Sequence, residues 1–313
     1  MDDVQELSVE WKYIPREYQL NPLHARADGI SRILLVWHRR AGKDLTVFNL
    51  VITEAMKRVG AYYYFFPTYG QGKKILWDGR IGDGTKFLDF IPRELIFNTN
   101  ETEMQVTLVN PNPRTPDAPE PGSIIQIIGT DRMDSVVGTN PIGCIFSEYS
   151  LQDPRAWDLV RPILRENGGW AAFVYTPRGR NHGWKLYNSV KNDPKWYVSV
   201  LTINDTRKPD GSPVVSAADV EQDIREGMDP DTAQQEYYCS WEGSTQGAYF
   251  ARQLQAARSS QRIGVVPYNA YLPVVTGWDI GVDDHTAIWF AQQSRRGQWD
   301  LIDYYEHRNE GLP

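Results

Sequence analysis

The sequence predicts an α/β fold with a mainly parallel sheet flanked by helices. Short apolar stretches of strand length recur through the first two thirds of the chain, and amphipathic stretches of helical length alternate with them. Parallel strands need crossover connections of this kind, and the connecting helices cover both faces of the sheet. The strands are expected to be apolar throughout for the same reason.

The composition is that of an ordinary globular chain. The 313 residues are 41% hydrophobic and 23% charged, which argues against disorder and against a membrane-spanning chain. The net charge of −7 excludes a uniformly basic coat for nucleic acid but not a local basic site. Two cysteines are too few for a disulfide scaffold or a cysteine-rich zinc module. With no signal-peptide pattern at the N-terminus, we expect a soluble protein in a reducing compartment, without membrane contact.

The expected elements follow in chain order. Residues 33–37 are a continuous apolar strand, and the helix expected over 44–58 places its apolar residues on one face. Further strands of the sheet are expected over 61–66, 123–128, 142–146, 171–175 and 196–201. Five prolines within 110–122 indicate a loop, and a helical region is expected over 217–238. Beyond a Gly/Ser/Thr-rich linker and a short helix, strands with an antiparallel pattern are expected over 272–279, 286–292 and 298–305.

The segment 33–44, ILLVWHRRAGKD, predicts a strand, a short turn and a helix that begins near Gly42 and Lys43. A helix N-terminus presents free N–H groups and a positive dipole end, which together bind phosphate, and a lysine can reach the terminal phosphates. The usual pattern is G-x-x-x-x-G-K-[ST], and here Trp37 and Asp44 replace its first and last residues. Gly-Lys alone is equally compatible with a plain turn and a surface lysine, but Arg39 and Arg40 favour a polyphosphate site.

A second apolar strand, 142–146, is followed by Ser147 and Glu148. Glu148 stands where a carboxylate would orient or polarise an attacking water. Ser147 stands where an aspartate usually holds Mg²⁺ through water. Since Asp44 replaces a hydroxyl and Ser147 replaces a carboxylate, we hypothesise a swapped metal shell that keeps one hydroxyl and one carboxylate beside Mg²⁺.

Seven motifs in order resemble those of the large terminase subunit of tailed bacteriophages, the ATP-driven DNA-packaging motor, which combines a P-loop ATPase of the ASCE type with an RNase H-like nuclease. The resemblance covers about residues 15 to 313. The motifs are PREYQ (15–19), HRRAGK (38–43), FPTYGQ (66–71), GTDRMDSVVG (129–138), FVYTPRG (173–179), QEYYCSW (235–241) and GWDIGVDDHTA (277–287).

The resemblance implies roles for the residues that match. Glu148 would be the catalytic glutamate, Thr176 would sense the γ-phosphate, and Arg39 would contact phosphate from within the same subunit. The implied nucleotide-binding residues are Gln19, which would read adenine, and Arg39, Arg40, Ala41, Gly42, Lys43 and Asp44 around the phosphates. Relatives carry an arginine that acts on the neighbouring subunit where this chain has Val137, so Arg132, Arg155 and Arg161 are left as candidates for that role.

The nuclease is expected to be incomplete. Asp279, at the end of an apolar strand, matches the first metal ligand, and Asp284 matches a further acidic position, although a turn pair with Asp283 explains it equally well. The other ligands of such nucleases lie on later elements, so the chain looks truncated before them. Glu306 is expected to follow the third strand and to be structural.

The resemblance also implies cofactors, partners and domains. It implies ATP with Mg²⁺, Mg²⁺ or Mn²⁺ for a complete nuclease, and action in the host-cell cytoplasm. The implied partners are double-stranded DNA, a portal protein and a small terminase subunit, with a homo-oligomeric ring on the procapsid and a monomer possible in solution. The candidates for DNA contact are Lys73, Lys74, Arg178 and Arg180, and each is equally compatible with a solvated basic patch. The implied domains are an ATPase core (1–200), a helical lid (201–245), a linker (246–264) and a partial nuclease (265–313).

Two other functions fit part of the pattern. A helicase-like ATPase shares the glutamine motif and the phosphate loop but needs a second similar domain with an arginine-rich final motif. An assembly subunit with a degenerate nucleotide site would explain the departures at Trp37, Asp44 and Ser147.

We expect the purified chain to bind or slowly hydrolyse ATP and not to cut DNA, because the matched acidic positions make an incomplete two-metal site. Supercoiled plasmid incubated with the chain and Mn²⁺ should stay supercoiled on a gel, as in a parallel sample with EDTA. Nicking or linearisation that requires Mn²⁺ would contradict this.

Overall fold

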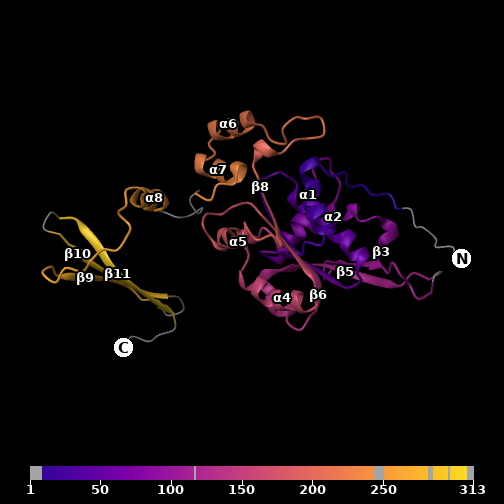
Figure 1. The fold of residues 1–313 in the computed structure, drawn as a ribbon, viewed down its shortest axis with the longest axis horizontal. Coiled ribbons are helices and arrows are strands. Elements are labelled where there is room, and N and C mark those ends of the chain that lie inside the picture. Colours follow the sequence, from indigo (N-terminus) through magenta and orange to yellow (C-terminus); the bar gives the residue numbers. More distant parts are fainter. Residues whose placement is uncertain (1–8, 116–117, 243–249, 281–284, 295–296, 309–313) are drawn as a thin grey trace. The chain divides into compact units, whose positions relative to one another are not determined.

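The computed structural model describes residues 9–115, 118–242, 250–280, 285–294 and 297–308. By its contacts the chain divides into two units, residues 1–246 and 247–313, which are described separately. The first unit is built on an eight-stranded sheet and the second on a three-stranded sheet (Figure 1). None of the described helices is both long and apolar enough to cross a bilayer.

The strands of the first unit are β1 (Arg32–Trp37), β2 (Ala61–Phe66), β3 (Ile96–Asn100), β4 (Gln105–Val109), β5 (Pro121–Gly129), β6 (Pro141–Ser147), β7 (Trp170–Tyr175) and β8 (Trp196–Leu201). Their order in the sheet is β3-β4-β5-β2-β6-β7-β1-β8. The strands from β5 to β8 in this order run parallel, whereas β3 and β4 are antiparallel at one edge. The expected mainly parallel sheet is thus confirmed. The two edge strands were not expected, because they are short and β3 is largely exposed, so they lack a buried apolar run.

The α-helices of this unit are α1 (Glu17–Ala27), α2 (Lys43–Lys57), α3 (Tyr69–Gly72), α4 (Arg155–Glu166), α5 (His182–Val190), α6 (Ala217–Arg225) and α7 (Pro230–Tyr238). The helical region expected over 217–238 is interrupted between α6 and α7. Gly227 lies there with a left-handed φ of 109°, and Asp229 caps α7 with Pro230 at its first position. These residues end one helix and begin the next.

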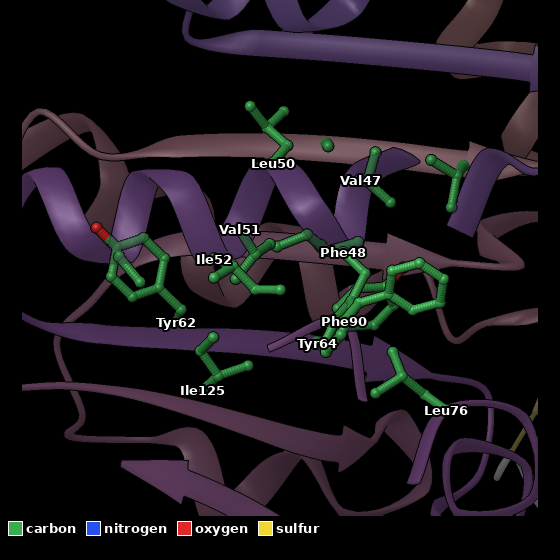
Figure 2. Close-up of a cluster of buried hydrophobic side chains, with 14 of the residues drawn as sticks. Val47, Phe48, Leu50, Val51, Ile52, Tyr62, Tyr64, Leu76, Phe90 and Ile125 are labelled. Atoms are coloured by element: carbon green, nitrogen blue, oxygen red, sulfur yellow. The ribbon is translucent and has the colours of Figure 1, made fainter. Parts of the chain in front are cut away.

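The core lies on both faces of the sheet. Residues of β1 alternate between the two faces, and α1 and α2 cover one face while α4 and α5 cover the other (Figure 1). Figure 2 shows side chains of α2 packed over the aromatic side chains of β2. Phe48 meets Tyr64 there at 6.3 Å between ring centroids, and Trp157 of α4 meets Phe173 at 5.0 Å on the other face. Burying these rings stabilises the sheet that carries the site.

Helices α6 and α7 form a small cluster of their own after β8 and the turn η6 (Ile203–Asp205). Ile203, Val220 and Ala233 are buried there, and Tyr237 OH donates to Asp223 Oδ2 at 2.6 Å. This cluster corresponds in sequence to the implied lid.

The second unit holds helix α8 (Ala251–Ser259) and the antiparallel strands β9 (Val274–Asp279), β10 (His285–Gln293) and β11 (Trp299–Arg308), in the order β11-β10-β9. The antiparallel pattern expected from the sequence is therefore present. Glu306 lies inside β11 and does not follow the strand, because the ladder with β10 continues to Arg308. The prediction of its place was wrong.

Candidate active site

The order of the strands decides which residues meet at the carboxyl edge of the sheet. Strand β7 lies between β1 and β6. Because parallel strands end at the same edge, the segments that follow them are neighbours, and ligands of α/β sheets bind there. The loop predicted to bind phosphate, residues 38–42 (the phosphate loop), follows β1. Ser147 ends β6, and Thr176 follows β7. Residues far apart in the chain are thus brought to one place.

The turn between β1 and α2 is tight without the first glycine of the usual pattern. Trp37, at that position, is fully buried and donates from Nε1 to Ser199 Oγ at 3.0 Å, so it belongs to the core. Arg40 and Gly42 supply the left-handed conformation, with φ of 72° and 79°. A Cβ on Gly42 would lie 2.7 Å from Nε2 of Gln19, so a side chain here would be strained at this φ and would displace the Gln19 amide.

Gln19 of α1 holds this turn in place. Its Nε2 donates to the carbonyl oxygen of Ala41 at 3.1 Å, and Tyr18 OH donates to the same oxygen at 2.8 Å. Its Oε1 accepts from the backbone N–H of Arg16 at 2.9 Å and from Tyr13 OH at 3.2 Å. The structure therefore places Gln19 beside the phosphate loop with its oxygen already paired twice. Its adenine-reading role stays a prediction.

Lys43, the first residue of α2, is buried among polar groups. Its Nζ lies 3.4 Å from Glu148 Oε1 and donates to Thr176 Oγ1 at 3.3 Å. Thr176 in turn donates to the carbonyl oxygen of Trp37 at 3.2 Å. Burial acts to lower the pKa of Lys43, but the carboxylates of Glu148 and Asp44 outweigh it, and the net shift is upward. The lysine is therefore a cation at neutral pH.

Asp44 meets Ser147, as the hypothesis of a swapped shell requires. Ser147 Oγ donates to Asp44 Oδ1 at 2.5 Å, and Tyr64 OH donates to the same oxygen at 3.1 Å. Burial raises the pKa of Asp44, while nearby Lys43 and the two hydroxyl donors act to lower it. Sequence reasoning missed the Tyr64 hydroxyl, because the aromatic run of β2 indicated only core packing.

Glu148 has an unusual backbone and an unpaired oxygen. Its φ is 54°, a left-handed conformation that is uncommon outside glycine and costs on the order of 1–3 kcal/mol. Its Oε2 is buried without a hydrogen-bond partner among the described residues. Strain and unpaired polar atoms persist where function requires them. This carboxylate oxygen therefore keeps its capacity to accept a hydrogen bond.

Sequence reasoning also missed Glu236 of α7, which lies within the motif 235–241. It is buried, and its carboxylate pairs with Arg178 and lies 3.7 Å from Arg39 Nη1. Its carbonyl oxygen accepts from the backbone N–H of Arg39 at 2.8 Å. By contrast, Arg40, the next residue of the loop, has an exposed side chain. Glu236 thus connects α7 to the phosphate loop and to the segment after β7, and no local sequence pattern predicts these contacts.

The candidates for the trans-acting arginine are placed differently. Arg155 and Arg161 lie on α4, where Arg155 Nη2 is 2.6 Å from Asp153 and Arg161 Nη2 is 3.5 Å from Asp158. The side chain of Arg132 lies outside the part of the chain that can be described. Exposed local ion pairs of this kind are worth little and do not select one arginine.

The DNA-contact candidates also differ. Lys73 and Lys74 are exposed in the π-helical turn η1 (Lys73–Trp77). Arg178 is held by Glu236, and Arg180 pairs with Glu242 and lies over the ring of Trp184. The two lysines are therefore the candidates with exposed side chains and without an ion pair among the described residues.

The nuclease candidates are split between described and undescribed residues. Asp279 ends β9 with an exposed side chain, and Asp284 lies outside the described residues. Within the described ranges, no group of three or more His, Cys, Asp and Glu side chains is arranged to hold a metal ion.

Solved structures of large terminases are similar to this chain. The ATPase domain of the Thermus phage P74-26 large terminase is 17% identical with a TM-score of 0.57, covering 74% of this chain and 95% of that domain. The large terminase of the thermophilic bacteriophage D6E, in complex with ADP, is 16% identical with a TM-score of 0.53, covering 93% of this chain and 68% of that one. The same D6E protein in complex with ATP-γ-S is 15% identical, with a TM-score of 0.53.

These likenesses show that the chain has the fold of a large terminase ATPase domain, the fold that the motifs indicated. No protein-family model matches the sequence. No curated protein matches it either. The comparisons therefore establish the fold alone.

His38 begins the phosphate loop and links it to Thr206, which follows η6. Its side chain is fully buried, with Nδ1 2.5 Å from the carbonyl oxygen of Arg39 and Nε2 2.7 Å from Thr206 Oγ1. Because a carbonyl only accepts, Nδ1 carries the proton and Thr206 donates to Nε2. Burial lowers the pKa of His38 to about 4.

This depressed pKa predicts a loss of stability in acid. Below a pH of about 6.5, the ordinary pKa of histidine, His38 is protonated in the unfolded chain but stays neutral in the folded chain. The free energy of unfolding therefore falls as the pH drops toward 4. His38→Asn, which keeps a donor and does not titrate, should remove about 2 kcal/mol of the decline between pH 7 and 4.5. Urea titrations over this range measure it, with exposed His24→Asn as the control. Parallel curves for His38→Asn and the wild type would contradict the prediction.

Proposed function

We propose that the chain is the ATP-hydrolysing motor of a phage DNA-packaging machine, a large terminase subunit. One observation carries this proposal: Lys43, Glu148 and Thr176 meet at the carboxyl edge of a parallel sheet, on three different segments. Phosphoryl transfer needs a cation at the β- and γ-phosphates and a group that orients the attacking water. The terminase fold and the D6E complexes with ADP and ATP-γ-S support the same activity.

The roles follow from the contacts. Nucleotide phosphates beside the N-terminus of α2 would draw the Lys43 ammonium from Glu148. Glu148 would then hold the attacking water through Oε2, which is unpaired among the described residues. Thr176, which touches Lys43 and the end of β1, would report the γ-phosphate to the segment after β7. Gln19 would face the base while holding the turn, with Arg39 as a further phosphate contact.

The polar groups that meet around Asp44 fit a magnesium ion. Asp44, Ser147 and Tyr64 bring one carboxylate and two hydroxyl groups together, and hard oxygen donors are what Mg²⁺ prefers. Asp44 and Ser147 would hold the ion with the nucleotide phosphates. When bound, it would neutralise charge that develops on the transferred phosphoryl group.

The proposal extends to DNA and to protein partners. Exposed Lys73 and Lys74 are proposed to grip DNA phosphates, which needs no base reading. The proposed assembly is a ring with a portal protein and a small terminase subunit in the host cytoplasm. The second unit is proposed to be part of an RNase H-like endonuclease, to which Asp279 and Asp284 would contribute two of the metal ligands. That unit has a three-stranded antiparallel sheet, which favours this function over a second helicase domain.

Substitution of Lys43 and Glu148 tests the ATPase. Lys43→Ala should weaken binding of a fluorescent ATP analogue at least tenfold, because it removes the cation at the phosphates. Glu148→Gln should retain binding and lower kcat by about 10²- to 10⁴-fold in a phosphate-release assay. Exposed Lys57→Ala, at the other end of α2, is the matched control. Equal binding by Lys43→Ala and the wild type would instead indicate a degenerate site.

The swapped metal shell predicts non-additive substitutions. Asp44→Ser alone should abolish Mg²⁺-dependent hydrolysis, because it leaves hydroxyl groups but no carboxylate among the groups that would hold the ion. Adding Ser147→Asp should partly restore hydrolysis, since the pair then has the usual order. Steady-state phosphate release over a Mg²⁺ titration measures both. Independent, additive losses would rule out the exchange.

A further inference from the structure

Behind the site, Gln152 closes the turn that carries Glu148. The residue is 3% exposed and follows the short turn η5 (Tyr149–Leu151). Its Nε2 donates to the carbonyl oxygen of Phe65 at 2.9 Å and to that of Ser147 at 2.7 Å. Because both partners only accept, the amide orientation is determined, with the NH₂ group toward the two carbonyls.

These two carbonyls belong to the ends of neighbouring strands. The ladder between β2 and β6 stops at the pair of Phe65 and Phe146. One residue before Phe65, Tyr64 presents its hydroxyl to Asp44, and Ser147 presents its own hydroxyl to the same carboxylate oxygen. Gln152 therefore joins β2 and β6 where the backbone ladder ends and where both strands present groups to Asp44.

The same amide supports a strained backbone. Glu148 is left-handed, and its turn is closed by the Leu151 N–H to the Glu148 carbonyl at 2.8 Å and by the Gln152 N–H to that of Tyr149 at 3.1 Å. The side-chain bond from Gln152 to Ser147 adds a third closure. A strained residue persists only where its surroundings over-determine its conformation.

This arrangement of the Gln152 amide has an energetic cost. Oε1 of Gln152 is buried without a hydrogen-bond partner among the described residues. An unpaired buried polar atom destabilises the fold, and an apolar side chain of the same shape would avoid this cost. The Gln152 amide therefore keeps one oxygen unpaired at the place where its NH₂ group bonds to the ends of two strands, next to the proposed reacting groups.

We infer that Gln152 is a positioning residue for ATP hydrolysis. It sets Glu148 and Ser147, at the end of β6, against Asp44 and Tyr64. This inference rests on the proposed ATPase function and adds to it a group that does not touch the nucleotide. Small displacements of a reacting group cost up to about 10²-fold in rate, so the effect belongs in kcat and not in nucleotide binding.

Gln152→Met tests the inference, because methionine is similar in length and cannot donate to the two carbonyls. We expect kcat for ATP to fall about 10- to 100-fold, while KM and the Kd of a fluorescent ATP analogue change less than threefold. Gln152→Asn, which keeps the amide on a shorter side chain, should lie between the wild type and Gln152→Met.

The matched control is Asn49→Leu. Asn49 of α2 is 2% exposed and donates from Nδ2 to the Leu45 carbonyl at 2.9 Å. Among the described residues its Oδ1 has no partner, and its side chain bonds to no strand end. This variant should change Tm without a selective loss of kcat. If the wild type hydrolyses ATP and both Gln152 variants keep its kcat, the inference fails alone. If the wild type does not hydrolyse ATP, the proposed function fails and the inference with it.

Discussion

The rest of the site depends on the interactions that the buried ammonium of Lys43 makes with its partners. Removing a charge from water costs several kcal/mol unless opposite charges and hydrogen bonds replace the lost hydration. Here Glu148 and Thr176 supply direct partners, and the carboxylate of Asp44 adds favourable charge. These partners come from the ends of β6 and β7 and from α2, so the charge is tolerated only when the strands are in this order.

Hydrogen bonds and ion pairs made by residues around the site hold the surroundings of the lysine in place. Gln19 and Tyr18 support the phosphate loop from α1, and Gln152 joins the ends of β2 and β6. On the other side, His38 and Glu236 connect the loop to the segments around the lid. Such contacts let Glu148 stay left-handed, because its surroundings over-determine the backbone. In the proposed ATPase, these contacts would preorganise the reacting groups before a nucleotide binds.

Much of the framework could be predicted from sequence because its signals are local. Apolar strands, an amphipathic helix and the Gly-Lys turn each lie within a few residues, and parallel strand ends must share an edge. The exchange between Asp44 and Ser147 could also be hypothesised, since both departures fall in recognisable motifs. Strands β3 and β4 could not be found, because short, partly exposed edge strands carry no buried apolar run.

By itself, then, the sequence determined the α/β class, the strand that carries the phosphate loop and the polar residues at the strand ends. Only the tertiary structure decided that Tyr64 turns its hydroxyl to Asp44, that Glu236 joins two arginines, and that Gln152 closes two strands. The physical reason is the range of the interactions. Periodicity and turn chemistry are properties of neighbours in the chain, whereas each of these hydrogen bonds and ion pairs needs a partner that the fold brings from elsewhere.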